Sequence, residues 1–326
     1  MKDLLAVLPE IIVTAVAILV LVVDAGAGER RARGWLPWLI LVGLVIALVS
    51  PAWSPASGPY FGGFVSVDAF AQFFRLVFIV LAGFTVLVAP AYLDREGVPA
   101  AEFYSTVLFS TIGAMTIALA TDLITLFVGL ELMSIPVYVL AGLQRRDRYA
   151  NEASLKYFLL GAFSSAILVY GFAWFFGIAG STDLAKIATA VGAAGLGSPA
   201  VVVGLALVTT GLGFKAAVVP FHQWTPDAYD GAPTPSTAFM SVAPKAAAFA
   251  AILRVMATAL GPASIDWALV FAILAVITMT AGNVVALVQT NVKRMLAYSS
   301  IAHTGYILAA VAAMAAGASA GAAVLF

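Results

Sequence analysis

Residues 123–143 read LITLFVGLELMSIPVYVLAGL, an apolar run that carries one charged residue, Glu131. A helix needs about 20 apolar residues to cross the hydrocarbon core of a bilayer, so this run predicts a membrane-spanning helix. Glu131 lies about nine residues from the start of the run, or about 13 Å along the helix axis. The run therefore predicts a membrane helix with an acidic group near the bilayer centre.

Further apolar runs of similar length occur along the chain. They lie at Leu4–Val23, Leu36–Val49, Phe70–Ala89, Phe103–Ala120, Leu155–Ile178, Val201–Val219, Phe239–Leu260, Trp267–Val288 and Met295–Ala313. Strands of a membrane barrel would alternate polar and apolar residues, and these runs do not alternate. The first run could be a cleaved signal peptide, but Asp3 cancels the charge of Lys2 and Pro9 interrupts the run, so we expect it to be retained. We therefore predict an all-α fold, a polytopic bundle of about ten membrane helices.

The composition of the chain agrees with this fold and excludes several functions. The chain has 326 residues, of which 63% are hydrophobic and 10% charged, whereas soluble domains are about 25% charged. Basic and acidic residues number 16 each, so no net field attracts nucleic acid and we expect no nucleic-acid partner. Cysteine is absent and histidine occurs twice, which leaves no thiolates for iron–sulfur clusters. We expect the chain to bind no redox cofactor and no metal.

Most basic residues lie in alternate loops between the predicted spans. These are Arg30, Arg31, Arg33, Arg95, Arg145, Arg146, Arg148, Lys293 and Arg294. The other loops and the N-terminus hold only Lys2 and Lys186. Because basic loops stay in the cytoplasm, this asymmetry predicts an N-terminus outside the cell.

Three charged residues fall well inside predicted spans, namely Glu131, Lys215 and Lys245. At about 2.5–3.5 kcal/mol each, they cost about 8–10 kcal/mol in total unless they are paired. Pro220 follows Lys215, and Pro244 directly precedes Lys245. Proline removes a backbone donor and clashes with the preceding turn, so we expect both helices to kink or break beside the lysine. Broken helices that carry charge at membrane depth are typical of transporters, where they line a hydrated cavity.

These charges lead to a hypothesis of proton transfer. A carboxylate near a buried ammonium changes its proton affinity, so we predict that Glu131 tunes Lys215, which exchanges protons with Lys245 through bound water. His222, in the loop after Lys215, and His303, inside the last span, could extend this relay because imidazole titrates near neutral pH. In the alternative interpretation, the charges only form salt bridges between helices, and His303 only makes an interhelical hydrogen bond.

Other charged residues in or near the spans have simpler interpretations. Arg75 lies seven residues after Asp68, on the same face of a helix two turns away, and we expect these two residues to pair. Arg254 and Lys156 lie near span ends, where their side chains can extend to the interface.

The loop Pro220–Ser236 contains no Lys or Arg and is rich in proline. We expect it to fold as an interfacial or re-entrant segment rather than a flexible linker. Its His222, Asp227 and Asp230 could instead bind a cation, although this is a weak metal pattern. Residues 183–187 could form a short amphipathic turn on the outer surface.

Four segments resemble the subunit N family of the proton-pumping NADH–quinone oxidoreductases, respiratory complex I. They are GLELMSIP at 129–136, KYFLLGAFSS at 156–165, FKAAVVPFHQWTPDAY at 214–229 and APKAA at 243–247. The resemblance runs along essentially the whole chain, and the motifs occur in the family's order. Carried over residue by residue, the family's key glutamate falls on Glu131, its broken-helix lysine on Lys215 and its central lysine on Lys245.

The resemblance implies an antiporter-like fold of two inverted five-helix repeats, each with a broken helix. On this basis we expect N-terminal helices 1–3 in residues 1–102, a first repeat in 103–262 and an incomplete second repeat in 263–326. The final residues, 321–326, look like the start of another helix, so we expect a truncated chain.

The family function implied is proton translocation in a bacterial inner membrane, driven by electron transfer from NADH to quinone. NADH, FMN, iron–sulfur clusters and quinone would be used by other subunits. The implied partners are the antiporter-like subunit M, small membrane subunits such as K, and the lipid bilayer. The alternatives are an Mrp-like cation/proton antiporter and a purely structural membrane subunit.

Overall fold

The computed structural model describes residues 2–26, 34–53, 57–195, 198–261 and 264–317. Within these ranges, ten helices are long and apolar enough to cross a membrane. Each overlaps one of the predicted spans, so the predicted all-α, multi-pass fold is confirmed. The cluster Arg30, Arg31 and Arg33 and the segment 321–326, on which two predictions rest, lie outside the described residues.

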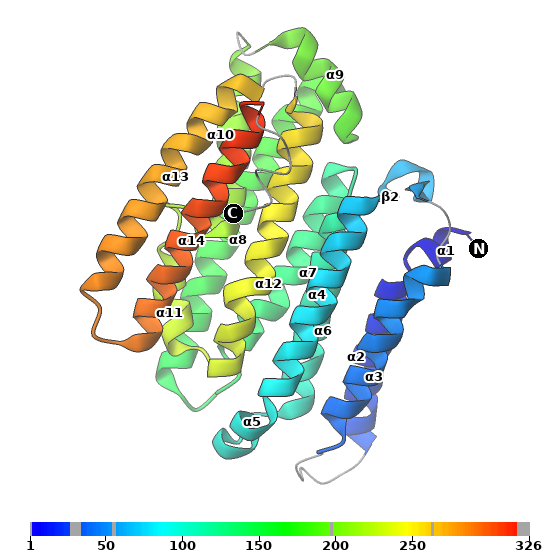
Figure 1. The fold of residues 1–326 in the computed structure, drawn as a ribbon, viewed down its shortest axis with the longest axis vertical. Helices are drawn as coiled ribbons and strands as arrows, with labels where there is room; N and C mark the ends of the chain where they lie inside the picture. Colours follow the sequence, from blue (N-terminus) through cyan, green and yellow to red (C-terminus); the bar gives the residue numbers. More distant parts are fainter. Residues whose placement is uncertain (1, 27–33, 54–56, 196–197, 262–263, 318–326) are drawn as a thin grey trace. The chain divides into compact units, whose positions relative to one another are not determined.

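Helices dominate the chain, with one small hairpin near the N-terminus (Figure 1). The helices are α1 (Lys2–Ala6), α2 (Leu8–Gly26), α3 (Leu36–Val49), α4 (Ala69–Val88), α5 (Pro90–Glu96), α6 (Ala100–Leu119), α7 (Leu123–Ala141), α8 (Arg148–Ala179), α9 (Leu184–Ala194), α10 (Pro199–Ala216), α11 (Trp224–Gly231), α12 (Thr234–Leu253), α13 (Ser264–Leu287) and α14 (Val292–Ala315). The remaining elements are the 3-10 turns η1 (Ser50–Trp53) and η2 (Phe61–Gly63), the strands β1 (Gly58–Tyr60) and β2 (Val65–Val67), and the π-helix η3 (Arg254–Ala259).

The chain divides into two compact units. The first comprises Met1–Ala120, Thr125–Leu155 and Gly231–Ala247. The second comprises Thr121–Ile124, Lys156–Asp230 and Ala248–Phe326. Of the five predicted relay residues, Glu131 and Lys245 belong to the first unit, and Lys215, His222 and His303 belong to the second.

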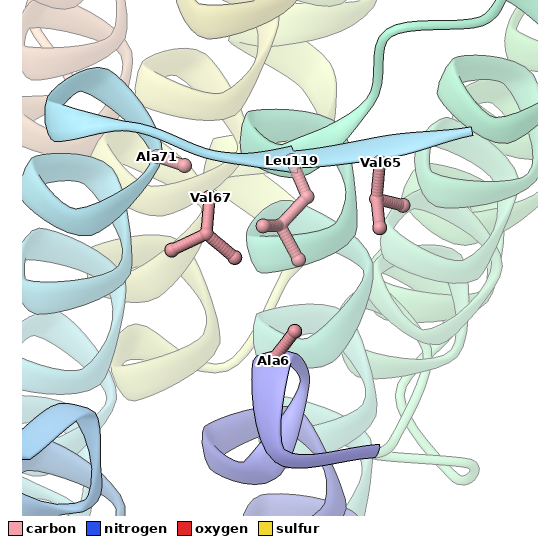
Figure 2. Close-up of a cluster of buried hydrophobic side chains, with 5 residues drawn as sticks. All are labelled: Ala6, Val65, Val67, Ala71 and Leu119. Atoms are coloured by element: carbon pink, nitrogen blue, oxygen red, sulfur yellow. The ribbon is translucent and has the colours of Figure 1, made fainter. Parts of the chain in front are cut away.

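In the first unit, a short antiparallel hairpin covers the ends of several helices. Strands β1 and β2 pair Gly58 with Val67 and Tyr60 with Val65. Alternate residues of a strand face the same side, so Val65 and Val67 point together into a buried apolar cluster. Figure 2 shows this cluster, which consists of Ala6, Val65, Val67, Ala71 and Leu119. The hairpin thus ties α1, α4 and α6 together at one end.

In the second unit, α13 and α14 lie side by side over their whole length (Figure 1). Glycines permit this contact, because a Cβ on Gly282 would lie 2.6 Å from the backbone nitrogen of Ala302 and one on Gly305 would lie 2.5 Å from that of Met279. Helix α9 packs against η3. It is longer than the short turn expected at 183–187, and Asp183 caps it by accepting a hydrogen bond from the Lys186 backbone at 2.9 Å.

The expected pair of Arg75 and Asp68 is wrong, because the structure gives both residues other roles. Arg75 forms an ion pair with Glu10 of α2, with Nε 2.7 Å from Oε1. Asp68 is the N-cap of α4 and accepts a hydrogen bond from the backbone of Ala71 at 2.7 Å. Helical spacing brought Asp68 and Arg75 to one face, but the cap residue is extended and its side chain turns back to the helix end.

Candidate functional site

The helix that carries Lys215 ends directly after it. Helix α10 stops at Ala216, and Ala217 takes a left-handed conformation with φ 64°. The Val218 N–H donates to the Gly213 carbonyl at 2.8 Å, and the Ala217 N–H donates to the Phe214 carbonyl at 3.0 Å. These two bonds form a Schellman-type helix end. The predicted break beside Lys215 is therefore confirmed, four residues before Pro220.

Lys215 is buried in the last turn of α10, with 5% of its surface exposed. The C-terminus of a helix carries a partial negative charge that favours a cation in this turn. Burial acts in the opposite direction, because it penalises a charged group. The helix end therefore supplies part of the electrostatic compensation that a buried ammonium group needs.

The loop after the break contains a short helix, where a folded segment rather than a flexible linker was expected. Helix α11 begins at Trp224, whose indole stacks on the ring of Tyr157 from α8 with centroids 4.2 Å apart and planes at 3°. The Trp224 Nε1–H donates to the Phe214 carbonyl at 2.9 Å. One buried side chain thus joins α11 to α8 and to the end of the Lys215 helix.

Charged residues hold the other end of α11. Asp227 accepts from Lys156 Nζ at 3.0 Å and from Arg294 Nη1 at 2.8 Å. Asp230 accepts from Asn291 Nδ2 at 2.8 Å, and its carbonyl accepts from Lys293 Nζ at 3.1 Å. Figure 1 shows α11 beside the turn that joins α13 to α14, where three of these donors lie.

The pKa of Asp227 reflects this network. Burial raises the pKa, but the hydrogen bonds from Arg294 and Lys156 lower it more, so the net shift is downward. Across the described ranges, no group of three or more His, Asp or Glu side chains is arranged to hold a metal ion. Asp227, one of the three residues of the possible cation site, is instead paired with Lys156 and Arg294.

The two histidines occupy different surroundings. His222 is partly buried, and burial lowers its pKa while a hydrogen bond with the Pro220 backbone raises it, with a net downward shift. Its ring lies 6.5 Å from that of Tyr298. His303 is exposed on α14, with Nδ1 2.8 Å from the Ser299 carbonyl. These contacts do not test the predicted relay roles.

Lys245 lies inside a continuous helix, so of the expected kink or break at this residue the break is wrong. Helix α12 runs from Thr234 through Pro244 to Leu253. Membrane helices tolerate proline where neighbouring groups satisfy the freed backbone carbonyl. The irregular segment is instead the π-helix η3, which starts at Arg254. Lys245 is nevertheless buried, with 6% of its surface exposed.

Glycines set the position of the helix that carries Glu131. Gly113 of α6 faces α7 so closely that a Cβ would lie 2.2 Å from the Met133 backbone nitrogen. Gly129 of α7 also lies close to α6, although less tightly, with a Cβ at 3.0 Å from the Ile117 backbone nitrogen. The two backbones therefore touch on both sides of Glu131, which is partly buried.

Sequence reasoning missed the residues that surround the break. Trp224, Thr278 and Thr304 contact the end of α10 from three other elements. Thr278 and Thr304 lie 59 and 88 residues from their partners, and no local pattern indicates such contacts.

Residues 120–326 match the family described as NADH:quinone oxidoreductase/Mrp antiporter, TM. NADH-quinone oxidoreductase subunit N of Trichlorobacter lovleyi is 47% identical over 309 residues, covering 94% of this chain and 63% of the relative. Subunit N 2 of Symbiobacterium thermophilum is 46% identical over 333 residues, covering 94% and 65%. The chain thus spans just under two thirds of the length of these relatives, which confirm the resemblance to the subunit N family.

Two solved structures share the fold. A chain of respiratory complex I from Thermus thermophilus with bound aureothin matches with a TM-score of 0.76 and 38% identity, covering 93% of this chain and 64% of that one. A chain of the Mrp complex from Dietzia sp. matches with a TM-score of 0.79 and 27% identity, covering 95% and 59%. The predicted antiporter-like fold is therefore confirmed.

Proposed function

Because the chain belongs to the NADH:quinone oxidoreductase/Mrp antiporter transmembrane family, we propose that it is a proton-translocating membrane-arm subunit of an NADH–quinone oxidoreductase. Relatives at 46–47% identity carry the name of subunit N of that enzyme. The observation that carries the proposal is the buried lysine in the last turn of a broken helix, Lys215. A proton pathway requires an ionisable group at membrane depth, and such groups are rare unless they function.

In this proposal, Lys215 binds and releases a proton at the end of α10. Glu131 and Lys245 remain its predicted partners, the first as the carboxylate that tunes it and the second as the next proton acceptor. His222 and His303 remain predicted stations of the same relay. The division into residues 1–102, 103–262 and 263–326, with inverted repeats, also stays a prediction.

The redox chemistry would take place in other subunits of the complex. NADH, FMN, iron–sulfur clusters and quinone would be bound there, and this chain would supply only the proton route. Its partners would be other membrane-arm subunits, including the antiporter-like subunit M and small subunits such as K. The protein would lie in the bacterial inner membrane with its N-terminus outside.

Replacing Lys215 by alanine tests the proposal. In inverted membrane vesicles that oxidise NADH, Lys215→Ala should lower proton uptake per NADH oxidised. Lys186→Ala is the matched control, because Lys186 is exposed on α9, outside the long apolar helices. An assembled Lys215→Ala variant that pumps at the wild-type ratio would contradict the proposal.

The second candidate is an Mrp-like cation/proton antiporter, which the structural likeness to the Dietzia Mrp complex favours. The same vesicles distinguish the two functions. Antiport would make proton flux depend on sodium in the absence of NADH, whereas a complex I subunit would move protons only during NADH oxidation.

A further inference from the structure

Three side chains from three elements bind the backbone at the end of α10. Two hydrogen bonds satisfy carbonyls, one from Trp224 Nε1 to Phe214 at 2.9 Å and one from Thr304 Oγ1 to Ala216 at 2.9 Å. The third satisfies an N–H, from Val219 to Thr278 Oγ1 at 3.1 Å. The three side chains belong to the second unit: Trp224 lies on α11, Thr304 on α14 and Thr278 on α13. The break is therefore held on both sides of Ala217.

The break needs such support for two reasons. A helix end leaves carbonyls without partners, and the end of α10 is buried, so bulk water does not replace them. Ala217 also adopts φ 64°, a conformation that a residue with a Cβ keeps only when its surroundings enforce it. Thr278 and Thr304 are both fully buried, so their hydroxyls reach this backbone away from solvent.

We propose that Thr278 and Thr304 are positioning residues that hold the end of α10 and so set the place of the Lys215 ammonium group. Thr304 caps the carbonyl of Ala216, the residue next to the lysine. Capping removes part of the negative charge that a helix C-terminus presents to a cation in its last turn. Thr278 accepts the N–H of Val219, two residues beyond Ala217, which holds the chain as it leaves the break.

This inference rests on the proposed function only for its effect on proton transfer. Its structural part concerns local unfolding of the backbone at the end of α10, which can be measured separately. Both parts are therefore tested with the same set of variants in the intact membrane complex.

The first measurement is amide hydrogen exchange over residues 215–221. Thr304→Val and Thr278→Val keep the side-chain shape but remove the hydroxyl, so exchange in this segment should become about tenfold faster. Thr304→Ser and Thr278→Ser keep the hydroxyl and should exchange at the wild-type rate. Thr209→Val is the matched control, because Thr209 is buried on α10 but lies before the break. Unchanged exchange in both valine variants would overturn the proposal.

The second measurement is the pH profile of NADH-driven proton uptake by membrane vesicles. Thr304→Val leaves the Ala216 carbonyl uncapped beside Lys215, which changes the surroundings of the ammonium group and should move the profile to higher pH. Thr304→Ser should restore the wild-type profile, and Thr209→Val should not move it.

The outcomes separate this inference from the proposed function. Faster exchange with an unmoved pH profile would mean that Thr304 is only a structural cap, and the positioning role would be rejected. Wild-type pumping by Lys215→Ala would reject the proposed function. In that case the exchange results would still decide whether the two threonines hold the break.

Discussion

Glu10 and Arg75 form a buried bidentate ion pair that joins α2 to α4 across 65 positions of sequence. Arg75 Nε lies 2.7 Å from Glu10 Oε1, and Nη2 lies 2.8 Å from Oε2. Nη2 also donates to the Ala6 carbonyl at 2.8 Å, so the arginine holds the end of α1 as well. Arg75 is 2% exposed and Glu10 is 7% exposed.

Breaking this pair should destabilise the protein strongly. Glu10→Ala would leave the guanidinium of Arg75 buried without its counter-ion, at a cost of about 3–5 kcal/mol. Thermal unfolding of the detergent-solubilised protein measures this loss. The double variant Glu10→Leu/Arg75→Met should recover much of the stability, because two apolar side chains need no partner. If Glu10→Ala alone unfolded at the wild-type temperature, the pair would have no role in stability.

The contact between α6 and α7 should be intolerant of a single methyl group. Gly113→Ala would place a Cβ 2.2 Å from the Met133 backbone nitrogen, so α7 and Glu131 must shift. Overpacking of this kind costs about 1–3 kcal/mol. Gly177→Ala is the matched control, because a Cβ on this α8 glycine meets nothing within 4 Å. The amount of assembled protein in membranes should fall for Gly113→Ala and stay level for Gly177→Ala.

The network around Asp227 should make stability depend on pH in the acid range. Its pKa is lowered in the folded protein, chiefly because hydrogen bonds from Arg294 and Lys156 outweigh the effect of burial. Above the ordinary aspartate pKa of about 3.9 its contribution is complete, and it is lost as the pH falls through the lower folded value. The carboxylate is partly exposed, so the contribution is below about 1 kcal/mol.

Asp227→Asn tests whether the ionised carboxylate of Asp227 stabilises the protein at neutral pH. The unfolding temperatures of variant and wild type should differ most at pH 5–7 and converge as the pH falls below about 4. A difference that stayed constant down to pH 2 would show that the charge of Asp227 is not responsible.

Local features of the sequence were sufficient for the spans and for the break at Lys215. A membrane helix is specified by about 20 consecutive apolar residues, and the end of α10 lies where glycine and proline are close in sequence. Long-range pairs were not predictable, because Arg75 was assigned to Asp68 by helical spacing although its partner lies 65 residues away. Lys156 likewise pairs with Asp227, 71 residues away.

A proline lies close to each lysine, but only one of the two helices ends there. Pro220 lies beyond a helix that had already ended, whereas Pro244 lies inside a continuous helix. The end of α10 is held by Thr278 and Thr304, which lie on the distant elements α13 and α14. Sequence spacing alone carries no information about them.

The two contacts of Trp224 can be separated by substitution. Trp224→Phe keeps an aromatic ring against Tyr157 but removes the Nε1–H that binds the Phe214 carbonyl. The Phe214 carbonyl keeps the Ala217 N–H as a partner, so losing the Trp224 hydrogen bond should cost about 0.5–1.5 kcal/mol. Trp224→Ala removes the stack as well, and large buried aromatic residues cost about 3–5 kcal/mol when truncated. Thermal unfolding should therefore rank wild type above Trp224→Phe and Trp224→Phe above Trp224→Ala, whereas equal stability of the first two would mean that the indole only packs.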